Sequence, residues 1–204
     1  RKSQMYDGGI RVPGVIEWPA RIKTPLVSQL NSVTSDILPT LCELVGIDLP
    51  PRELDGLSLT GVFDGSLRHR PAPIFFWQYN VGQNKQREPW IARPLQIGTT
   101  PLVKMMGNVY TRTFTNFKHP KIVTSDFDGS RVVLADHYKL VVAGNGASLK
   151  VQLFKVPDDV AEEKDISTEN PEVVRSMLEQ LRTWQNSVLT SLTGAEYKPR
   201  NSSK

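Results

Sequence analysis

Few side chains in this sequence have the spacing that nucleophilic catalysis or metal binding requires. The only cysteine, Cys42, lies in an apolar segment at residues 37–45, with no adjacent base or cation to activate a thiolate. The three histidines, His69, His119 and His137, lack the mutual spacing of a metal site. Neither a Gly-x-Ser-x-Gly elbow nor a Gly-rich phosphate loop occurs. We therefore interpret Cys42 as a small buried hydrophobic residue, and these residue types predict no self-contained catalytic centre.

The strongest functional pattern is in the first segment, residues 1–13, which reads RKSQMYDGGIRVP. It places Lys2 four residues before an aromatic side chain, which an Asp-Gly-Gly group follows. The two glycines favour a tight turn or a close backbone approach. Shorter patterns follow in the order EWP at residues 17–19, SDILPTL at residues 35–41 and DGLSL at residues 55–59.

In this order and spacing, these segments resemble the sulfatases of the alkaline-phosphatase-like superfamily. The first segment looks like the family's lysine, aromatic, acidic, Gly-Gly-x-Arg-x-Pro signature, and residues 138–141 and 153–154 resemble its C-terminal strands. The resemblance covers nearly the whole chain, most weakly from about residue 80 to 128. It implies the C-terminal part of a sulfuric ester hydrolase that uses a formylglycine nucleophile and a calcium ion.

The resemblance also implies that Lys2 contacts the sulfate, as both a catalytic and a substrate-binding residue. Hydrolysis of a sulfate ester develops charge on the leaving oxygen, so fixed cations and donors must surround the sulfuryl oxygens. A lysine ammonium is a compact charge with three donors and suits this task. Without the signature, Lys2 would be a frayed terminal lysine. Arg11 is expected to pair with a neighbouring carboxylate rather than with a substrate anion.

Residues that would complete such an enzyme are missing from this sequence. The family nucleophile lies in a Cys/Ser-x-Pro-x-Arg motif, whereas the nearest segment here, residues 48–52, begins with Asp48, which cannot be oxidised to formylglycine. The paired aspartates that bind calcium and the family's Asp-Asn pair are also absent. We therefore expect no metal ligand in this chain, and we expect the N-terminal part of the same protein to supply calcium and formylglycine. The chain alone is expected to be inactive.

Two other functions stay open, a phosphoester hydrolase of the same superfamily and a non-catalytic binding or structural module. The 25 basic and 21 acidic residues give a net charge of +4, without the basic stripe of a nucleic-acid-binding protein. No stretch approaches the ~20 apolar residues of a membrane span. The resemblance implies a sulfated small molecule or saccharide as substrate, and export to the periplasm, the extracellular space or the lysosome.

The elements that must position these residues follow from periodicity and breakers. Val15 and Ile16, between prolines, predict a buried strand. A helix is expected from about residue 36 to 45, ended by Gly46. Further strands are expected at residues 74–77, 130–135, 138–142 and 150–156, and a helix from Pro171 to about Leu192.

This order predicts an α/β fold with two parts. Residues 1–70 would form the C-terminal end of an alkaline-phosphatase-like sheet. Residues 71–204 would form a small antiparallel sheet packed on a C-terminal helix. A long loop at about residues 80–129 is expected to help select the leaving group, with Lys118 and His119 as candidate substrate-binding residues. A solvated insertion without substrate contact is the alternative for this loop.

Overall fold

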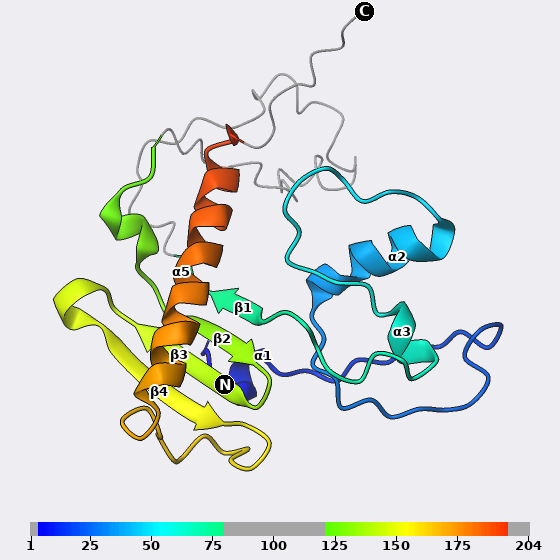
Figure 1. The fold of residues 1–204 in the computed structure, drawn as a ribbon, viewed down its shortest axis with the longest axis horizontal. Helices are drawn as coiled ribbons and strands as arrows, with labels where there is room; N and C mark the ends of the chain where they lie inside the picture. Colours follow the sequence, from blue (N-terminus) through cyan, green and yellow to red (C-terminus); the bar gives the residue numbers. More distant parts are fainter. Residues whose placement is uncertain (1–3, 80–120, 196–204) are drawn as a thin grey trace, which may run out of the picture. The chain divides into compact units, whose positions relative to one another are not determined.

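The computed structural model describes residues 4–79 and 121–195 of the chain (Figure 1). Residues 1–78 and 128–185 form one compact unit, and residues 79–127 and 186–204 form a second. The first unit contains all the strands that the structure describes. The sequence-based division after residue 70 stays a prediction.

A four-stranded antiparallel sheet forms the centre of the first unit. In order, its strands are β1 (Ile74–Trp77), β2 (Arg131–Ala135), β3 (Tyr138–Ala143) and β4 (Lys150–Lys155). Ala135 pairs with Tyr138, so β2 and β3 are joined by Asp136 and His137 alone, and Asp136 adopts a φ of 49°. Asp tolerates this left-handed conformation better than most residues. The predicted antiparallel sheet is confirmed.

Helix α5, Pro171–Leu192, covers one face of the sheet (Figure 1). Proline at the first helical position loses no intrahelical hydrogen bond. Gly194 follows the helix with a φ of 76°. The core between helix and sheet consists of Val133, Leu140, Val142, Leu153, Met177 and Leu181. Within the described residues, no helix has the length and apolar character to cross a bilayer.

The opposite face of the sheet packs against the beginning of the chain. Its buried residues Val132, Val141 and Phe154 contact Met5, Tyr6, Ile10 and Phe76. Neighbouring residues of a strand point to opposite faces, so Leu140 belongs to the α5 side and Val141 to this one. The sheet is therefore covered on both faces, by α5 and by residues 5–10.

Val15 and Ile16 do not form the predicted buried strand. Residues 11–18 contain no helix or strand, and Val15 and Ile16 are 92% and 56% exposed. A strand is stable only where a neighbour satisfies its backbone hydrogen bonds. None of the described strands pairs with this segment.

Helix α2, Ile37–Val45, follows a short 3-10 helix, η1 (Thr34–Asp36), and ends at Gly46, which has a φ of 71°. This end is the one that the sequence predicts. The buried residues of α2 are Pro39, Thr40 and Cys42. Its apolar outer face, however, is open to solvent and consists of Ile37, Leu38, Leu41 and Val45.

Asp36, the last residue of η1, joins several segments of the chain. Its fully buried carboxylate accepts hydrogen bonds from the N–H groups of Val33 and Leu57, at 2.8 and 2.9 Å. Both terminal nitrogens of Arg70 donate to the same carboxylate at 2.8 Å. Burial acts to raise the pKa of Asp36, but Arg70 and the two N–H groups hold that pKa below its usual value. Asp36 thus joins α2 to the segments around Leu57 and Arg70.

Gly56 lies where the DGLSL segment meets η1, and we expect Gly56→Ala to destabilise the protein by about 1–3 kcal/mol. A Cβ at this position would lie 2.0 Å from the Ser35 carbonyl oxygen, and a backbone atom cannot rotate away. Urea unfolding measures the effect. Gly14→Ala is the matched control, because a Cβ there meets nothing within 4 Å. Equal stability of the two variants would contradict this packing.

The second unit is described at residues 79, 121–127 and 186–195. A short 3-10 helix, η4 (Thr124–Phe127), holds the buried Asp126. This carboxylate accepts hydrogen bonds from the N–H of Val123 at 2.7 Å and from the hydroxyl of Tyr79 at 3.2 Å. Burial and the nearby charge of Asp126 raise the pKa of Tyr79 well above its usual value. Most of the predicted long loop, residues 80–120, lies outside the described residues.

Candidate functional site

The described part of the first signature is a single helical turn. Helix α1, Asp7–Ile10, begins after Tyr6, whose backbone is extended. The N–H of Gly9 donates to the Tyr6 carbonyl at 2.7 Å, and the N–H of Arg11 to the Asp7 carbonyl at 2.9 Å. The tight turn predicted at the two glycines is therefore present. Lys2 itself lies outside the described residues.

A buried lysine fixes this turn to the sheet. Lys139 of β3 is fully buried, and its Nζ lies 2.8 Å from Asp7 Oδ1 and 2.5 Å from Glu162 Oε1. The N–H of Asp7 donates to Glu162 Oε2 at 2.7 Å, so the two carboxylate residues are also joined directly. Buried charges are costly unless they are paired. These three residues form one ion network, which we call the Lys139 cluster.

Tyr6 provides a second attachment between the beginning of the chain and the sheet. Its hydroxyl donates to Gln152 Oε1 of β4 at 2.6 Å. Its ring meets that of Phe154 edge to face, with 6.2 Å between the centroids. An aromatic residue that combines an apolar contact with a satisfied hydroxyl is well suited to such a half-buried position. The signature segment is thus held by a charged contact at Asp7 and by an aromatic contact at Tyr6.

Arg11 pairs with a carboxylate, as expected from the sequence. Its Nη1 lies 3.4 Å from Asp7 Oδ2, and its side chain is 64% exposed. An exposed pair at this distance contributes little to stability. The geometry of Arg11 gives it no role beyond this pairing.

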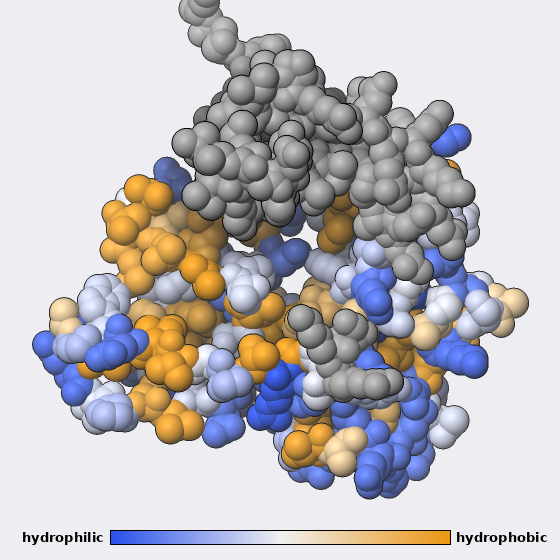
Figure 2. Space-filling view, turned by 180° about the vertical axis from the view of Figure 1, so that it is seen from behind, coloured by the Kyte–Doolittle hydropathy of each residue, from blue (hydrophilic) through white to orange (hydrophobic). Residues whose placement is uncertain are grey.

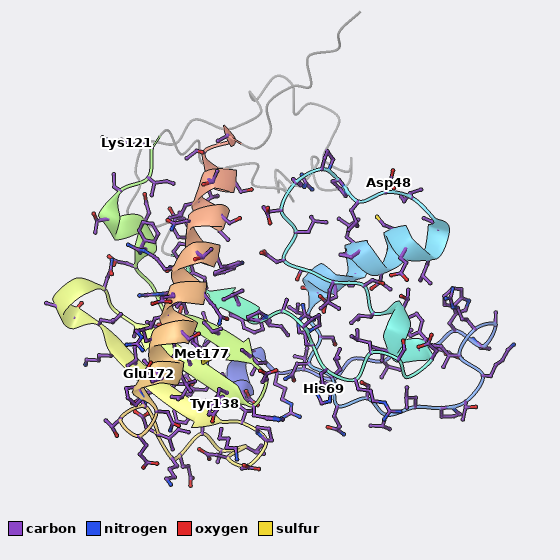
Figure 3. The ribbon with its side chains drawn as sticks, viewed as in Figure 1. Asp48, His69, Lys121, Tyr138, Glu172 and Met177 are labelled. Atoms are coloured by element: carbon purple, nitrogen blue, oxygen red, sulfur yellow. The ribbon has the colours of Figure 1, made fainter. Side chains whose placement is uncertain are left out.

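The other residues considered from the sequence are separated in the fold. Cys42 is 4% exposed within α2, which confirms its interpretation as a buried hydrophobic residue. Asp48 is exposed just after α2, and His69 lies in a different segment, so the two do not converge (Figure 3). Lys118 and His119 lie outside the described residues.

Sequence analysis missed the Lys139 cluster and the partner of Asp36. The sequence did contain a signal for the Lys139 cluster, because Lys139 interrupts the apolar run of residues 138–142. A lysine at the centre of a buried strand needs a carboxylate partner. Nothing in the sequence, however, indicated that the partners would be Asp7 and Glu162, 132 positions before and 23 positions after it.

A calcium site of the kind implied by the resemblance does not fit the described residues. In residues 4–79 and 121–195, no three side chains of His, Cys, Asp or Glu are grouped so that they could hold a metal ion. Asp7 and Glu162 are brought together, but Lys139 lies between them as their counter-ion. A divalent ion at this position would have to displace that buried ammonium.

The known proteins to which this chain is similar are sulfatases. No protein-family model matches the chain. Over 199 residues, 96% of the chain and 29% of the relative, it is 28% identical to Arylsulfatase K of Mus musculus. Over 76 residues, 37% of the chain and 15% of the relative, it is 36% identical to Arylsulfatase A of Homo sapiens. The crystal structure of yidJ from Bacteroides fragilis, described as a sulfatase, superposes with a TM-score of 0.50 at 16% identity, covering 86% of this chain and 30% of that one.

These matches agree with the resemblance of the first signature. The structural match, at 16% identity, shows a shared fold. The chain spans less than a third of the length of each of these three proteins. The chain is similar to sulfatases, and its partial coverage fits their C-terminal part.

Proposed function

We propose that the full-length protein is a sulfatase and that this chain supplies its sulfate-contacting lysine, Lys2, together with the C-terminal subdomain. The observation that supports this most directly is the similarity to Arylsulfatase K over 96% of the chain. The fold adds a second support, because the segment that follows Lys2 is locked to the sheet through Tyr6 and the Lys139 cluster.

In the proposed reaction, the Lys2 ammonium donates hydrogen bonds to a sulfuryl oxygen and offsets the charge that develops as the ester bond breaks. Such a donor is effective only when it is held in place before the reaction begins. The Lys139 cluster would provide this by fixing Asp7, five residues after Lys2. Lys139 and Glu162 are then positioning residues, because their charges are paired with each other and with Asp7 in the cluster.

The nucleophile and the calcium ion are proposed to come from the N-terminal part of the same protein. Cys42 is the only cysteine, and it is buried in α2 without a following Pro-x-Arg. In the N-terminal part, a formylglycine residue would supply the nucleophilic oxygen, and a bound calcium ion would offset the sulfate charge. The described residues of this chain hold neither group, so their part is limited to binding and orienting the ester.

An exposed apolar surface supports the proposed association with the rest of the protein. The outer face of α2 is apolar, and a helix that is apolar on its outer face as well is normally buried in a larger protein. The preceding segment adds further exposed apolar side chains, Val12, Val15, Ile16, Leu26 and Val27. Figure 2 shows apolar side chains open to the surface on the side that holds α2. A covering N-terminal part would also offer Val15 and Ile16 a strand neighbour, which none of the described strands provides.

The substrate is proposed to be a sulfated small molecule or saccharide. Lys118 and His119 are retained as proposed substrate-binding residues, and export from the cytosol is proposed from the relationship with sulfatases. A phosphoester hydrolase and a non-catalytic binding or structural module are the competing functions.

The test is turnover of 4-nitrophenyl sulfate by the full-length protein and by the 204-residue chain. We expect hydrolysis by the full-length protein and none above the buffer blank by the chain, which lacks the Cys/Ser-x-Pro-x-Arg motif. 4-Nitrophenyl phosphate is the comparison substrate. Faster turnover of the phosphate would favour the phosphoester hydrolase. Absence of turnover of both esters by the full-length protein would favour the binding or structural module.

A further inference from the structure

The connection between β3 and β4 contains an Asn-Gly pair, Asn145 and Gly146. Gly146 is exposed to solvent and Asn145 is half-buried. In such a pair, the backbone nitrogen of the glycine can attack the side-chain carboxamide of the asparagine, because glycine has no side chain that hinders the approach. The pair is therefore a candidate site of chemical modification.

The fold places the two reacting groups side by side. The N–H of Gly146 donates to Asn145 Oδ1 at 3.0 Å, so the attacking nitrogen lies next to the carboxamide. Gly146 has a φ of 53°, a conformation that glycine adopts readily. Only a local rotation of the backbone separates this arrangement from ring closure.

Ser148 opposes that rotation. The N–H of Asn145 donates to Ser148 Oγ at 3.3 Å, and the hydroxyl of Ser148 donates to the Asn145 carbonyl at 2.8 Å. These contacts hold Asn145 in an extended conformation, with a ψ of 159°. Ring closure requires the nitrogen of Gly146 to rotate into the plane of the Asn145 side chain, away from this ψ. The folded connection therefore slows the reaction and makes its rate depend on opening of the Ser148 contacts.

We infer that Asn145 is a deamidation site whose rate is controlled by Ser148. In the first step, a bond forms between the nitrogen of Gly146 and Cγ of Asn145, the Cγ–Nδ2 bond breaks, and Nδ2 leaves as ammonia with the proton of the Gly146 amide. In the second step, water opens the resulting succinimide ring at one of its two carbonyl carbons and gives aspartate or isoaspartate. Water is the only co-reactant.

The two products have different consequences for the hairpin. Aspartate keeps a side-chain oxygen that accepts from the N–H of Gly146. Isoaspartate moves a methylene group into the backbone and lengthens the connection between Ala143 and Lys150, which pair at the ends of β3 and β4. This connection has little room, because a Cβ at Gly144 would lie 2.3 Å from the Ser148 carbonyl oxygen. Isoaspartate is therefore expected to loosen this end of the sheet.

The test is incubation of the full-length protein at neutral and at mildly alkaline pH, followed by peptide mapping with mass spectrometry that distinguishes aspartate from isoaspartate. We expect both products at position 145, formed faster at the higher pH, because the attack requires loss of the Gly146 amide proton. Ser148→Ala is expected to deamidate about fivefold faster, the usual effect of losing one net hydrogen bond. Protein unfolded in guanidinium chloride is expected to deamidate fastest.

Asn31 is the internal control in the same peptide maps. It is exposed, but its neighbour Ser32 carries a side chain, so it should stay unmodified over the same interval. The inference is overturned if residue 145 remains asparagine after the unfolded protein has converted, if Ser148→Ala reacts no faster than the wild type, or if Asn31 reacts equally fast. Asn145→Asp carries the charge of the product without the longer backbone. The isoaspartate form should therefore unfold at a lower urea concentration than Asn145→Asp, and equal unfolding would refute the proposed loosening of the hairpin.

Discussion

Replacing Lys139 with methionine is expected to lower the free energy of unfolding by about 3–5 kcal/mol, the usual cost of removing one partner from a buried ion pair. Methionine fills a similar volume, so the loss arises from charge rather than from packing. The substitution would leave the carboxylates of Asp7 and Glu162 without the Lys139 ammonium, which lies 2.8 and 2.5 Å from them. The measurement is urea unfolding at neutral pH.

A triple variant provides the internal check on this argument. Combining Lys139→Met with Asp7→Asn and Glu162→Gln removes all three charges, and we expect it to be more stable than Lys139→Met alone. Lys155→Met controls for loss of a lysine, since Lys155 is 51% exposed at its side chain and its pairing with Asp158 contributes little. A loss below about 1 kcal/mol for Lys139→Met would show that the cluster does not anchor α1.

Lys2→Ala in the full-length protein is expected to lower kcat/KM for 4-nitrophenyl sulfate by about 10²–10³-fold. The reason is the loss of one fixed donor at the charge that develops in the transition state. Lys2→Arg should retain part of the activity, because it keeps the charge but changes its shape.

Arg11→Ala is the matched control in the same segment. Its guanidinium is exposed and pairs with Asp7 at 3.4 Å, so its removal should change kcat/KM little. Equal activity of Lys2→Ala and the wild type would remove Lys2 from the site. Equal losses for Lys2→Ala and Arg11→Ala would indicate a disturbed segment rather than a lost sulfate contact.

Local patterns sufficed to predict the sheet and the last helix. Strand β3 reads as a largely apolar run beside a two-residue turn, and α5 carries its own start and stop residues at Pro171 and Gly194. These signals lie within each element, so they need no knowledge of the tertiary structure.

Features that depend on partners distant in the sequence were not predictable. Val15 and Ile16 have the composition of a buried strand, but a strand also requires a neighbour, and none of the described strands provides one. Asp36 looked like a residue at the beginning of a helix, whereas its main partner is Arg70, 34 positions later. The resemblance at residues 1–13 indicated a site, but not the Lys139 cluster that anchors it.

The Lys139 cluster also has a consequence for biosynthesis. Asp7 meets Glu162 across 155 positions of sequence, so this contact of the first segment cannot form until residue 162 has been translated. At ribosomal rates of about 5–20 residues per second, Met5, Tyr6 and Ile10 would wait about 8–30 s for their place on the sheet. During that interval the side chains of Met5, Tyr6 and Ile10 stay exposed to solvent. A chaperone that recognises short apolar stretches could protect them. Docking of the first segment on the sheet is therefore expected to be a late step of folding.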